Sequence, residues 1–229
     1  MTSLAPGYRA LILGASGGIG AALGRALRRD PGCGAVIGLS RRADGLDITR
    51  EASIAAAVAG LPDDLRLILC ATGALTIDGV GPERTLRAMT PEAMMRQFAV
   101  NALGPALAIK HLVPRLPRGE RALIGVLSAR VGSIGDNRLG GWIAYRTAKA
   151  ALNQILRTVA VELARTHPRA VIAALHPGTV ATGLSEPFAA GRDRLAPDDS
   201  ARALLAVLDG LRPEESGGFF APDGRRIEW

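Results

Sequence analysis

Apolar and polar positions alternate along this chain in blocks whose spacing predicts strands and helices in turn. Short continuous apolar runs are typical of buried parallel strands, and they lie at residues 9–13, 35–39, 65–70, 121–128 and 169–175, with a shorter run near Phe219. Apolar residues at helical spacing, with caps and helix breakers at the ends, predict the helices. These lie between a glycine cluster and residue 29, and at residues 53–59, 91–112, 142–166 and 199–211.

This alternation predicts the fold class. Successive β-α-β units close right-handed into a parallel sheet that is covered on both faces. At 229 residues, α/β chains regularly form a single unit, and no internal repeat, low-complexity tract or linker divides this one. We therefore expect an α/β protein in which residues 1–229 form a single Rossmann-type domain, a doubly wound parallel β-sheet with helices on both faces.

A glycine-rich loop joins the first predicted strand to the first predicted helix and reads GASGGIG. Glycines let the backbone turn tightly and approach a phosphate, and the helix N-terminus offers unpaired N–H groups at the positive end of the helix dipole. The spacing fits both G-x-x-x-G-x-G and G-x-x-G-x-x-G and leaves the subfamily open; a turn that binds nothing is the alternative. We predict that the loop binds the pyrophosphate of a dinucleotide through Gly14, Ser16, Gly17, Gly18, Ile19 and Gly20.

The residues after the second predicted strand bear on the choice of dinucleotide. An acidic side chain there binds the ribose hydroxyls of NAD, whereas an arginine accommodates the 2′-phosphate of NADP. The strand ends in Leu39-Ser40-Arg41-Arg42, without a carboxylate at its end. Arg41, beside Ser40, is placed for a charge-assisted phosphate contact, although both arginines could also be solvated loop residues. We predict NADP(H) in preference to NAD(H).

Tyr145 and Lys149 are candidates for the chemistry. They lie four residues apart in a predicted helix and so project from the same face. A free tyrosine, with a pKa of roughly 10, is a poor acid or base near neutral pH, but a neighbouring ammonium favours the phenolate and lowers that pKa. The pair is a weak pattern alone and a strong one after a glycine loop. We predict Tyr145 as the general acid and base, with Lys149 tuning it and contacting the nicotinamide ribose.

At this point the sequence resembles the short-chain dehydrogenase/reductase superfamily over nearly the whole chain, and Asn101 favours its classical type. The resemblance implies that Asn101 helps to hold a water next to Lys149 and that Asp47 touches the adenine. It also implies cofactor contacts of Ile48, of Ala71, Thr72 and Gly73, where the family has N-N-A-G, and of Pro177, Gly178, Val180 and Thr182, in the segment that clamps the nicotinamide carboxamide.

Residues 128–137 and 140–146 carry a finer resemblance, to the group of the C-factor protein and the Sniffer-type carbonyl reductases. One position departs from the superfamily pattern. In the family, a serine at the end of the fifth strand hydrogen-bonds the substrate oxygen, and Ala129 stands at that place here. The candidate hydroxyls are Ser128, after a local backbone shift, and Ser133, across the loop. We predict Ser128.

Charge, cysteines and the chain start exclude several other classes. The chain has 28 basic and 21 acidic residues, a formal net charge of +7, but its arginines are scattered and no nucleic-acid-binding motif occurs. Two cysteines are too few for a disulfide scaffold, and neither a signal peptide nor an apolar run of membrane-spanning length is present. No grouping of His, Cys and carboxylates has metal-ligand spacing. We expect a cytoplasmic protein without nucleic-acid, membrane or metal partners.

We therefore predict an NADP(H)-dependent oxidoreductase that transfers a hydride between nicotinamide and a small-molecule carbonyl or alcohol, as a carbonyl reductase does. The loop at residues 183–197 is expected to act as a lid over the substrate, with a surface excursion as the alternative. The family resemblance implies a homo-oligomer, a dimer or tetramer. The alternative function is a catalytically weak NAD(P)-binding regulatory or signalling protein, which Ala129 suggests; a polyanion-binding protein is supported by net charge alone.

Overall fold

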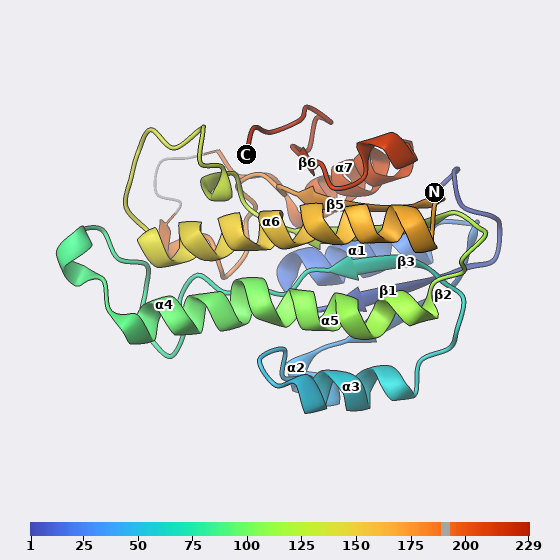
Figure 1. The fold of residues 1–229 in the computed structure, drawn as a ribbon, viewed down its shortest axis with the longest axis horizontal. Coiled ribbons are helices and arrows are strands. Elements are labelled where there is room, and N and C mark those ends of the chain that lie inside the picture. Colours follow the sequence, from blue (N-terminus) through green and yellow to red (C-terminus); the bar gives the residue numbers. More distant parts are fainter. Residues whose placement is uncertain (189–192) are drawn as a thin grey trace.

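The structure, a computed structural model that describes residues 1–188 and 193–229, is built on one parallel sheet with the strand order β2-β1-β3-β4-β5-β6 (Figure 1). The fold class predicted from the sequence is confirmed. After β2 the chain crosses to the other side of β1, so the connections diverge between β1 and β3, where open α/β sheets bind ligands. The strands are β1 (Tyr8–Leu13), β2 (Cys33–Leu39), β3 (Leu65–Cys70), β4 (Ala122–Leu127), β5 (Ala170–Leu175) and β6 (Phe219–Phe220).

Helices cover both faces of this sheet (Figure 1). On one face lie α1 and α7, and on the other α3, α5 and α6. A single-turn helix, α2, follows β2 and has no counterpart in the sequence prediction, because a run of two arginines carries no helical period. The helices are α1 (Gly18–Arg28), α2 (Arg41–Asp44), α3 (Glu51–Ala59), α4 (Pro91–Phe98), α5 (Gly104–Leu112), α6 (Ile143–Thr166) and α7 (Pro197–Gly210).

The predicted helix at residues 91–112 is confirmed, with one local departure from α-helical geometry. A π-helical turn, Ala99–Leu103, separates α4 from α5. Pro105 has no N–H to donate to the carbonyl of Asn101, so the regular hydrogen-bond ladder cannot pass this point. Gly104 adds a close approach, since a Cβ there would lie 2.6 Å from the carbonyl oxygen of Ile48. Asn101 lies within this π-helical turn and is buried.

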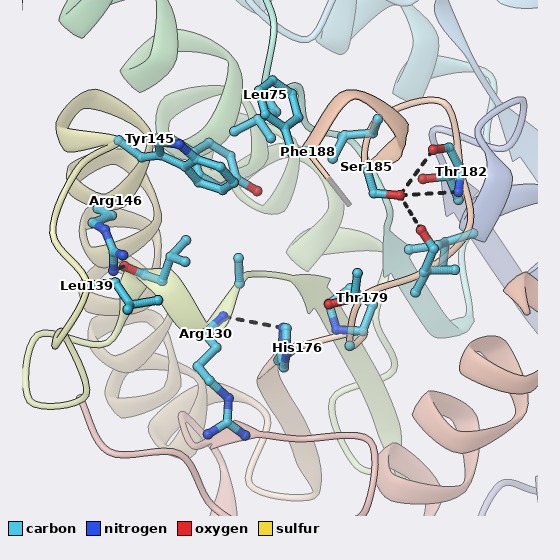
Figure 2. A pocket seen from close by; sticks show the side chains of 18 of the residues that line it. Leu75, Arg130, Leu139, Tyr145, Arg146, His176, Thr179, Thr182, Ser185 and Phe188 are labelled. Atoms are coloured by element: carbon cyan, nitrogen blue, oxygen red, sulfur yellow. Dashed lines mark hydrogen bonds between the residues drawn. The ribbon is translucent and has the colours of Figure 1, made fainter. Parts of the chain in front are cut away.

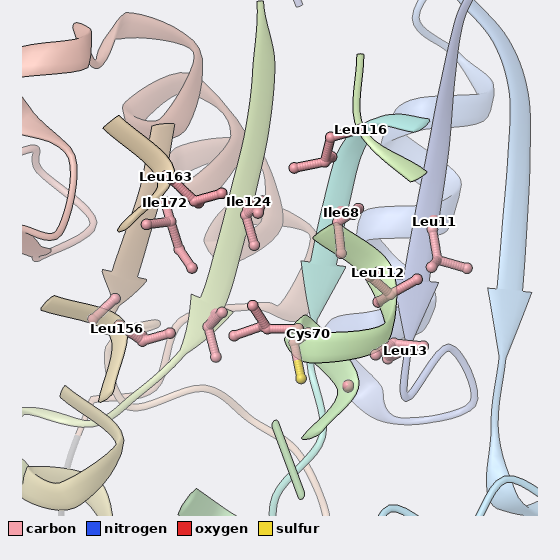
Figure 3. Packing of buried hydrophobic residues seen from close by; sticks show 14 of the residues in the cluster. Leu11, Leu13, Ile68, Cys70, Leu112, Leu116, Ile124, Leu156, Leu163 and Ile172 are labelled. Atoms are coloured by element: carbon pink, nitrogen blue, oxygen red, sulfur yellow. The ribbon is translucent and has the colours of Figure 1, made fainter. Parts of the chain in front are cut away.

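The strands alternate their side chains between two cores. Figure 3 shows the core between the sheet and α5 and α6. Neighbouring positions, such as Ala10 and Ile12, point to the opposite face and pack against Leu23 and Leu27 of α1. This period of two explains why the strand runs are apolar throughout. The labelled side chains of Figure 3 are Leu11, Leu13, Ile68, Cys70, Leu112, Leu116, Ile124, Leu156, Leu163 and Ile172.

Leu156 offers a test of this packing, because it is 0% exposed on the sheet-facing side of α6. We expect Leu156→Ala to lower the free energy of unfolding by about 2–5 kcal/mol, through lost apolar burial and the cavity left behind. Leu86→Ala removes the same atoms from a side chain that is 71% exposed and should change it by less than about 0.5 kcal/mol. Urea unfolding followed by circular dichroism measures both, and equal effects would contradict the assigned core.

Candidate active site

The glycine loop holds its shape through close backbone contacts. Gly14 has a φ of +82°, and a Cβ there would lie 2.8 Å from the carbonyl oxygen of Ala71, at the end of β3. A Cβ on Gly20 would overlap the carbonyl oxygen of Gly14. Gly17 is the N-cap residue of α1 and gives it no side-chain cap. The first N–H groups of α1 therefore face the loop without a side-chain partner, as a phosphate site requires.

The loop after β2 contains a carboxylate that the sequence prediction overlooked. Asp44 folds back within α2, where its Oδ2 accepts a hydrogen bond of 2.7 Å from the N–H of Ser40. The hydroxyl of Ser40 caps α2 by accepting from the N–H of Ala43 at 3.1 Å. Arg41, the first residue of α2, is exposed. A basic side chain and a tethered carboxylate thus share the loop where the adenosine ribose of a dinucleotide would lie.

Asp47 and Ile48 lie in the next stretch of chain. The Oδ1 of Asp47 accepts hydrogen bonds from the N–H and the hydroxyl of Thr49, at 2.9 and 2.6 Å. These bonds hold the pKa of the Asp47 carboxyl below its ordinary value. Ile48 packs against Gly104 at the start of α5. Asp47 is therefore a fixed, charged acceptor beside the sheet edge.

A cavity of about 350 Å³, here called the glycine-loop cavity, opens beside the loop. It is lined by residues at the carboxyl ends of β3, β4 and β5, by the glycine loop and by α6. The fold therefore brings these separate segments of the sequence together. A Cβ on Gly18 would lie 2.5 Å from the Cγ2 of Thr182, so the loop touches the segment after β5. The predicted site residues that line this cavity are Gly17, Gly18, Ile19, Gly20, Ala71, Thr72, Gly73, Ser128, Tyr145, Lys149, Pro177 and Thr182.

Tyr145 and Lys149 are both buried on α6. The ammonium of Lys149 donates a 2.9 Å hydrogen bond to the carbonyl of Leu127 and lies 5.8 Å from the centroid of the Tyr145 ring. Burial lowers the pKa of Lys149 to about 8. Burial also raises the pKa of Tyr145, against the lowering that we expected from the ammonium. The phenol of Tyr145 is thus held in its protonated form at neutral pH.

Asn101 belongs to a buried hydrogen-bond network rather than to a cavity wall. Its Nδ2 donates to the carbonyl of Ala74 at 2.8 Å, and its Oδ1 accepts from the N–H of the same residue at 3.1 Å. The Nδ2 also donates to the Oε1 of Gln97, at 2.7 Å, and Gln97 donates to the carbonyl of Leu75. Sequence reasoning missed Gln97, although it precedes Asn101 by one helical turn. The network fixes the chain after β3, which carries Gly73.

A second cavity of about 440 Å³, the tyrosine cavity, lies on the other side of Tyr145. Figure 2 shows the Tyr145 hydroxyl pointing into it, with Leu75 and Phe188 along one side and His176 and Thr179 across from them. Gly178 and Val180 line this cavity instead of the first. The residues that line both cavities are Ile19, Tyr145, Pro177, Thr182 and Leu184. Tyr145 therefore stands at their junction.

Trp142 is a wall residue of the tyrosine cavity that sequence reasoning did not single out. Its ring lies edge-on to those of Tyr145 and Phe188, with centroids 6.4 and 5.4 Å apart. Phe188 belongs to the predicted lid, together with Leu184, so this part of residues 183–197 does face the cavity. Residues 189–192 of that prediction lie outside the described residues. The lining gives the cavity a mainly apolar and aromatic wall near the Tyr145 hydroxyl.

The two candidate serines differ in where their hydroxyls are engaged. The Oγ of Ser128 is buried and donates a 2.7 Å hydrogen bond to the Oδ1 of Asn153, one turn beyond Lys149. The Oγ of Ser133 accepts from the N–H of Asp136. Ala129 lines the tyrosine cavity. The Ser128 hydroxyl is thus engaged by α6, and Ser128 lines the glycine-loop cavity rather than the tyrosine cavity.

His176 lies across the tyrosine cavity from Tyr145 and is uncharged near neutral pH. Its Nδ1 accepts from the backbone N–H of Arg130 at 3.3 Å. Burial, together with the Arg130 guanidinium, lowers the pKa of His176 to about 4.

In the described part of the chain, His, Cys and carboxylate side chains form no group that could hold a metal ion. No described helix is long and apolar enough to cross a membrane.

Comparison with known proteins agrees with this arrangement. A family model described as Enoyl-(Acyl carrier protein) reductase matches residues 34–219. The 1-hydroxy-2-glutathionyl-2-methyl-3-butene dehydrogenase of Rhodococcus sp. (strain AD45) is 32% identical over 188 residues, which cover 81% of this chain and 79% of that protein. C-signal of Myxococcus xanthus is 39% identical over 137 residues, 59% of this chain and 78% of C-signal.

A solved structure extends the similarity to the whole fold. The NADPH-bound carbonyl reductase from chicken fatty liver superposes with a TM-score of 0.81 at 26% identity, covering 99% of this chain and all of that one. The glycine loop lies between β1 and α1, and Tyr145 and Lys149 lie together on α6, as the sequence motifs predict. The chain is therefore an oxidoreductase of the short-chain dehydrogenase/reductase superfamily.

Proposed function

We propose that this oxidoreductase uses NADP(H) to interconvert a carbonyl compound and its alcohol, with Tyr145 as the group that moves the proton. The observation that carries the proposal is the position of Tyr145, which borders both cavities and lies beside Lys149. A titratable side chain shared by a cavity that fits a dinucleotide and one that fits a small molecule stands where the two reactants meet.

The glycine-loop cavity suits the pyrophosphate and nicotinamide end of a dinucleotide. The loop contacts other backbone so closely at Gly14 and Gly20 that side chains are excluded, and the N–H groups at the start of α1 carry no side-chain cap. Thr72 and Gly73, after β3, offer backbone hydrogen-bonding groups to the cofactor. Lys149 lines the same cavity and can donate a hydrogen bond to a ribose hydroxyl. When bound, the nicotinamide supplies or accepts the hydride.

The protein's own groups manage the proton. Tyr145, which burial keeps protonated, donates its proton to the substrate oxygen during reduction and takes it back during oxidation. The Lys149 ammonium then stabilises the phenolate that forms, because an opposite charge beside it favours the ionised state. Its hydrogen bond to Leu127 keeps the ammonium in place during this change. The donors aimed at the developing charge are therefore positioned before the reaction.

The preference for NADP(H) rests on the loop after β2. Arg41 is exposed at the start of α2 and free to turn toward a 2′-phosphate. Asp44, which could otherwise bind ribose hydroxyls, is tied to the N–H of Ser40. The structurally similar chicken enzyme is described as NADPH-bound. We expect the 2′-phosphate to be recognised by Arg41.

The tyrosine cavity suggests a substrate with a bulky apolar part. Leu75, Trp142 and Phe188 supply the wall near Tyr145, and aromatic faces of this kind favour aromatic or branched aliphatic groups. This apolar wall is consistent with a carbonyl reductase that acts on such compounds, and the structurally similar chicken protein is a carbonyl reductase. The dehydrogenase name of the Rhodococcus relative supports the same chemistry in the oxidative direction.

A second candidate is a cofactor-binding regulatory protein with weak catalysis. Ala129, which places a methyl group where the family has a hydroxyl, favours it, and the similarity to C-signal supports it weakly. Tight NADPH binding without reduction of any member of a broad panel of aldehydes, ketones and quinones would establish this function instead.

Tyr145→Phe tests the proposed proton transfer. We expect turnover to fall by about 10²–10⁴-fold, because the general acid is lost, while the affinity for NADPH stays within about twofold. Tyr8→Phe is the matched control, since Tyr8 is the other tyrosine of the chain and its hydroxyl donates to Asp30, between α1 and β2 and outside both cavities. Steady-state kinetics and cofactor-fluorescence titration measure both quantities. Unchanged turnover of Tyr145→Phe would refute the role of Tyr145.

Arg41→Ala tests the cofactor preference. Loss of a charge-assisted phosphate contact of about 1.5–3 kcal/mol should raise the Kd of NADPH by roughly tenfold or more and leave the Kd of NADH unchanged. Arg42→Ala, in the same exposed turn, serves as the control and should affect neither. Isothermal titration with both cofactors checks this, and a parallel loss of NADH affinity would count against 2′-phosphate recognition.

Ala129→Ser tests whether carbonyl polarisation is incomplete. The new hydroxyl would stand on the wall of the tyrosine cavity, and we expect kcat/KM to rise about tenfold, as one added hydrogen bond to an oxyanion allows. Ser128→Ala should lower kcat/KM by less than about threefold, because the Ser128 hydroxyl is engaged by Asn153. A loss above about a hundredfold in Ser128→Ala would instead assign Ser128 as the donor, as the sequence pattern predicts.

A further inference from the structure

Glu83 is a buried charge that the proposed reaction does not use. It lies between β3 and α4 and is 9% exposed. Among the carboxylates of residues 1–188 and 193–229, the side chain of Glu83 is the buried one. No arginine or lysine of these residues forms an ion pair with it. Burying a carboxylate is costly unless strong hydrogen bonds replace its water shell. Its partners must therefore be found among neutral donors.

Those donors are the first N–H groups of α6. The Oε1 of Glu83 accepts a hydrogen bond from the N–H of Ala144, and its backbone carbonyl accepts one of 2.6 Å from the N–H of Trp142. The helix has no cap of its own, because its N-cap residue is Trp142 and its first turn contains no acid. A carboxylate at this end also faces the positive end of the helix dipole. Glu83 thus caps α6 from outside the helix.

The backbone that enters α6 needs such a restraint. Gly140, Gly141 and Trp142 have φ values of +63°, +65° and +55°, three consecutive left-handed residues. Glycine adopts this conformation freely, but a tryptophan does so at a cost, because its Cβ approaches the backbone. The bond between the Trp142 N–H and the Glu83 carbonyl holds the strained residue in place. Its indole consequently reaches Tyr145 and Phe188, edge-on to both.

We propose that Glu83 is a positioning residue: by capping α6 it sets the first turn that carries Tyr145 and holds Trp142 as the wall of the tyrosine cavity. This inference rests on the proposed role of Tyr145. Tyr145 directly follows Ala144, whose N–H the carboxylate holds, so a shift of that turn moves the phenol relative to both cavities. The glycine loop lies on another element, and Lys149 is held one turn further along α6 by its own hydrogen bond to Leu127, so we expect the affinity for the cofactor to change little.

The experiment compares Glu83→Ala, Glu83→Gln and the control Glu162→Ala, which removes an exposed carboxylate from the same helix. Each variant is made alone and with Trp229→Phe, because the chain has two tryptophans and this change leaves Trp142 as the fluorescent one. The readouts are kcat, KM, the Kd of NADPH, the thermal midpoint and the emission of Trp142. Tyr145→Phe is measured in parallel.

We expect Glu83→Ala to lower kcat about tenfold or more, raise KM, and shift the Trp142 emission to longer wavelength with stronger acrylamide quenching. The Kd of NADPH should stay within about twofold. Glu83→Gln keeps an oxygen acceptor for the Ala144 N–H and should restore kcat to within about threefold of the parent, with the parent emission. Glu162→Ala should behave as the parent in every readout.

Three outcomes would overturn the proposal. The first is a Glu83→Ala variant with parent kcat and emission; the second is a Glu83→Gln variant that is folded yet as impaired as Glu83→Ala. The third is a loss of NADPH affinity in step with kcat, which would indicate general loss of structure. Full turnover of Tyr145→Phe would refute the proposed function separately, and the Trp142 emission would still test the cap.

Discussion

A buried ammonium group is stable only when a hydrogen-bond acceptor replaces its water shell. For Lys149 that acceptor is the carbonyl of Leu127, at the end of β4. This one hydrogen bond ties α6 to the carboxyl edge of the sheet. Because Tyr145 precedes Lys149 by one helical turn, the bond also sets where the phenol stands. Gly73 leaves room beside it for the Asn101 side chain, since a Cβ there would lie 2.9 Å from the Oδ1 of Asn101.

Hydrogen bonds between uncharged groups also fix the chain at this edge of the sheet. Asn101, within the π-helical turn, hydrogen-bonds both backbone groups of Ala74, and Gln97, in the turn before it, hydrogen-bonds the carbonyl of Leu75. These partners belong to the loop after β3, which borders both cavities. The helix thereby holds this loop in place. Each buried polar group in this network has a partner, which is the condition for such networks to be rigid.

The local features of this site could be predicted from the sequence. The apolar runs predicted the strands, the glycine spacing predicted the loop, and the spacing of Tyr145 and Lys149 predicted their common face. The missing parts depend on hydrogen bonds and burial that an apolar pattern does not encode. The Asp44 carboxylate turns back onto the N–H of Ser40, and a π-helical turn replaces one regular turn before Pro105. The pKa of Tyr145 rises because of burial that only the folded chain creates.

The left-handed entry into α6 has a consequence for how such a protein can diverge. Asp136, Arg138 and Leu139 line the tyrosine cavity and are exposed, so these positions can change at small cost to folding. Gly140 and Gly141 cannot change in the same way, because any Cβ there would meet a disfavoured backbone conformation. New substrate preferences can therefore arise in this exposed stretch, while Gly140 and Gly141 preserve the entry into α6, the helix that carries Tyr145.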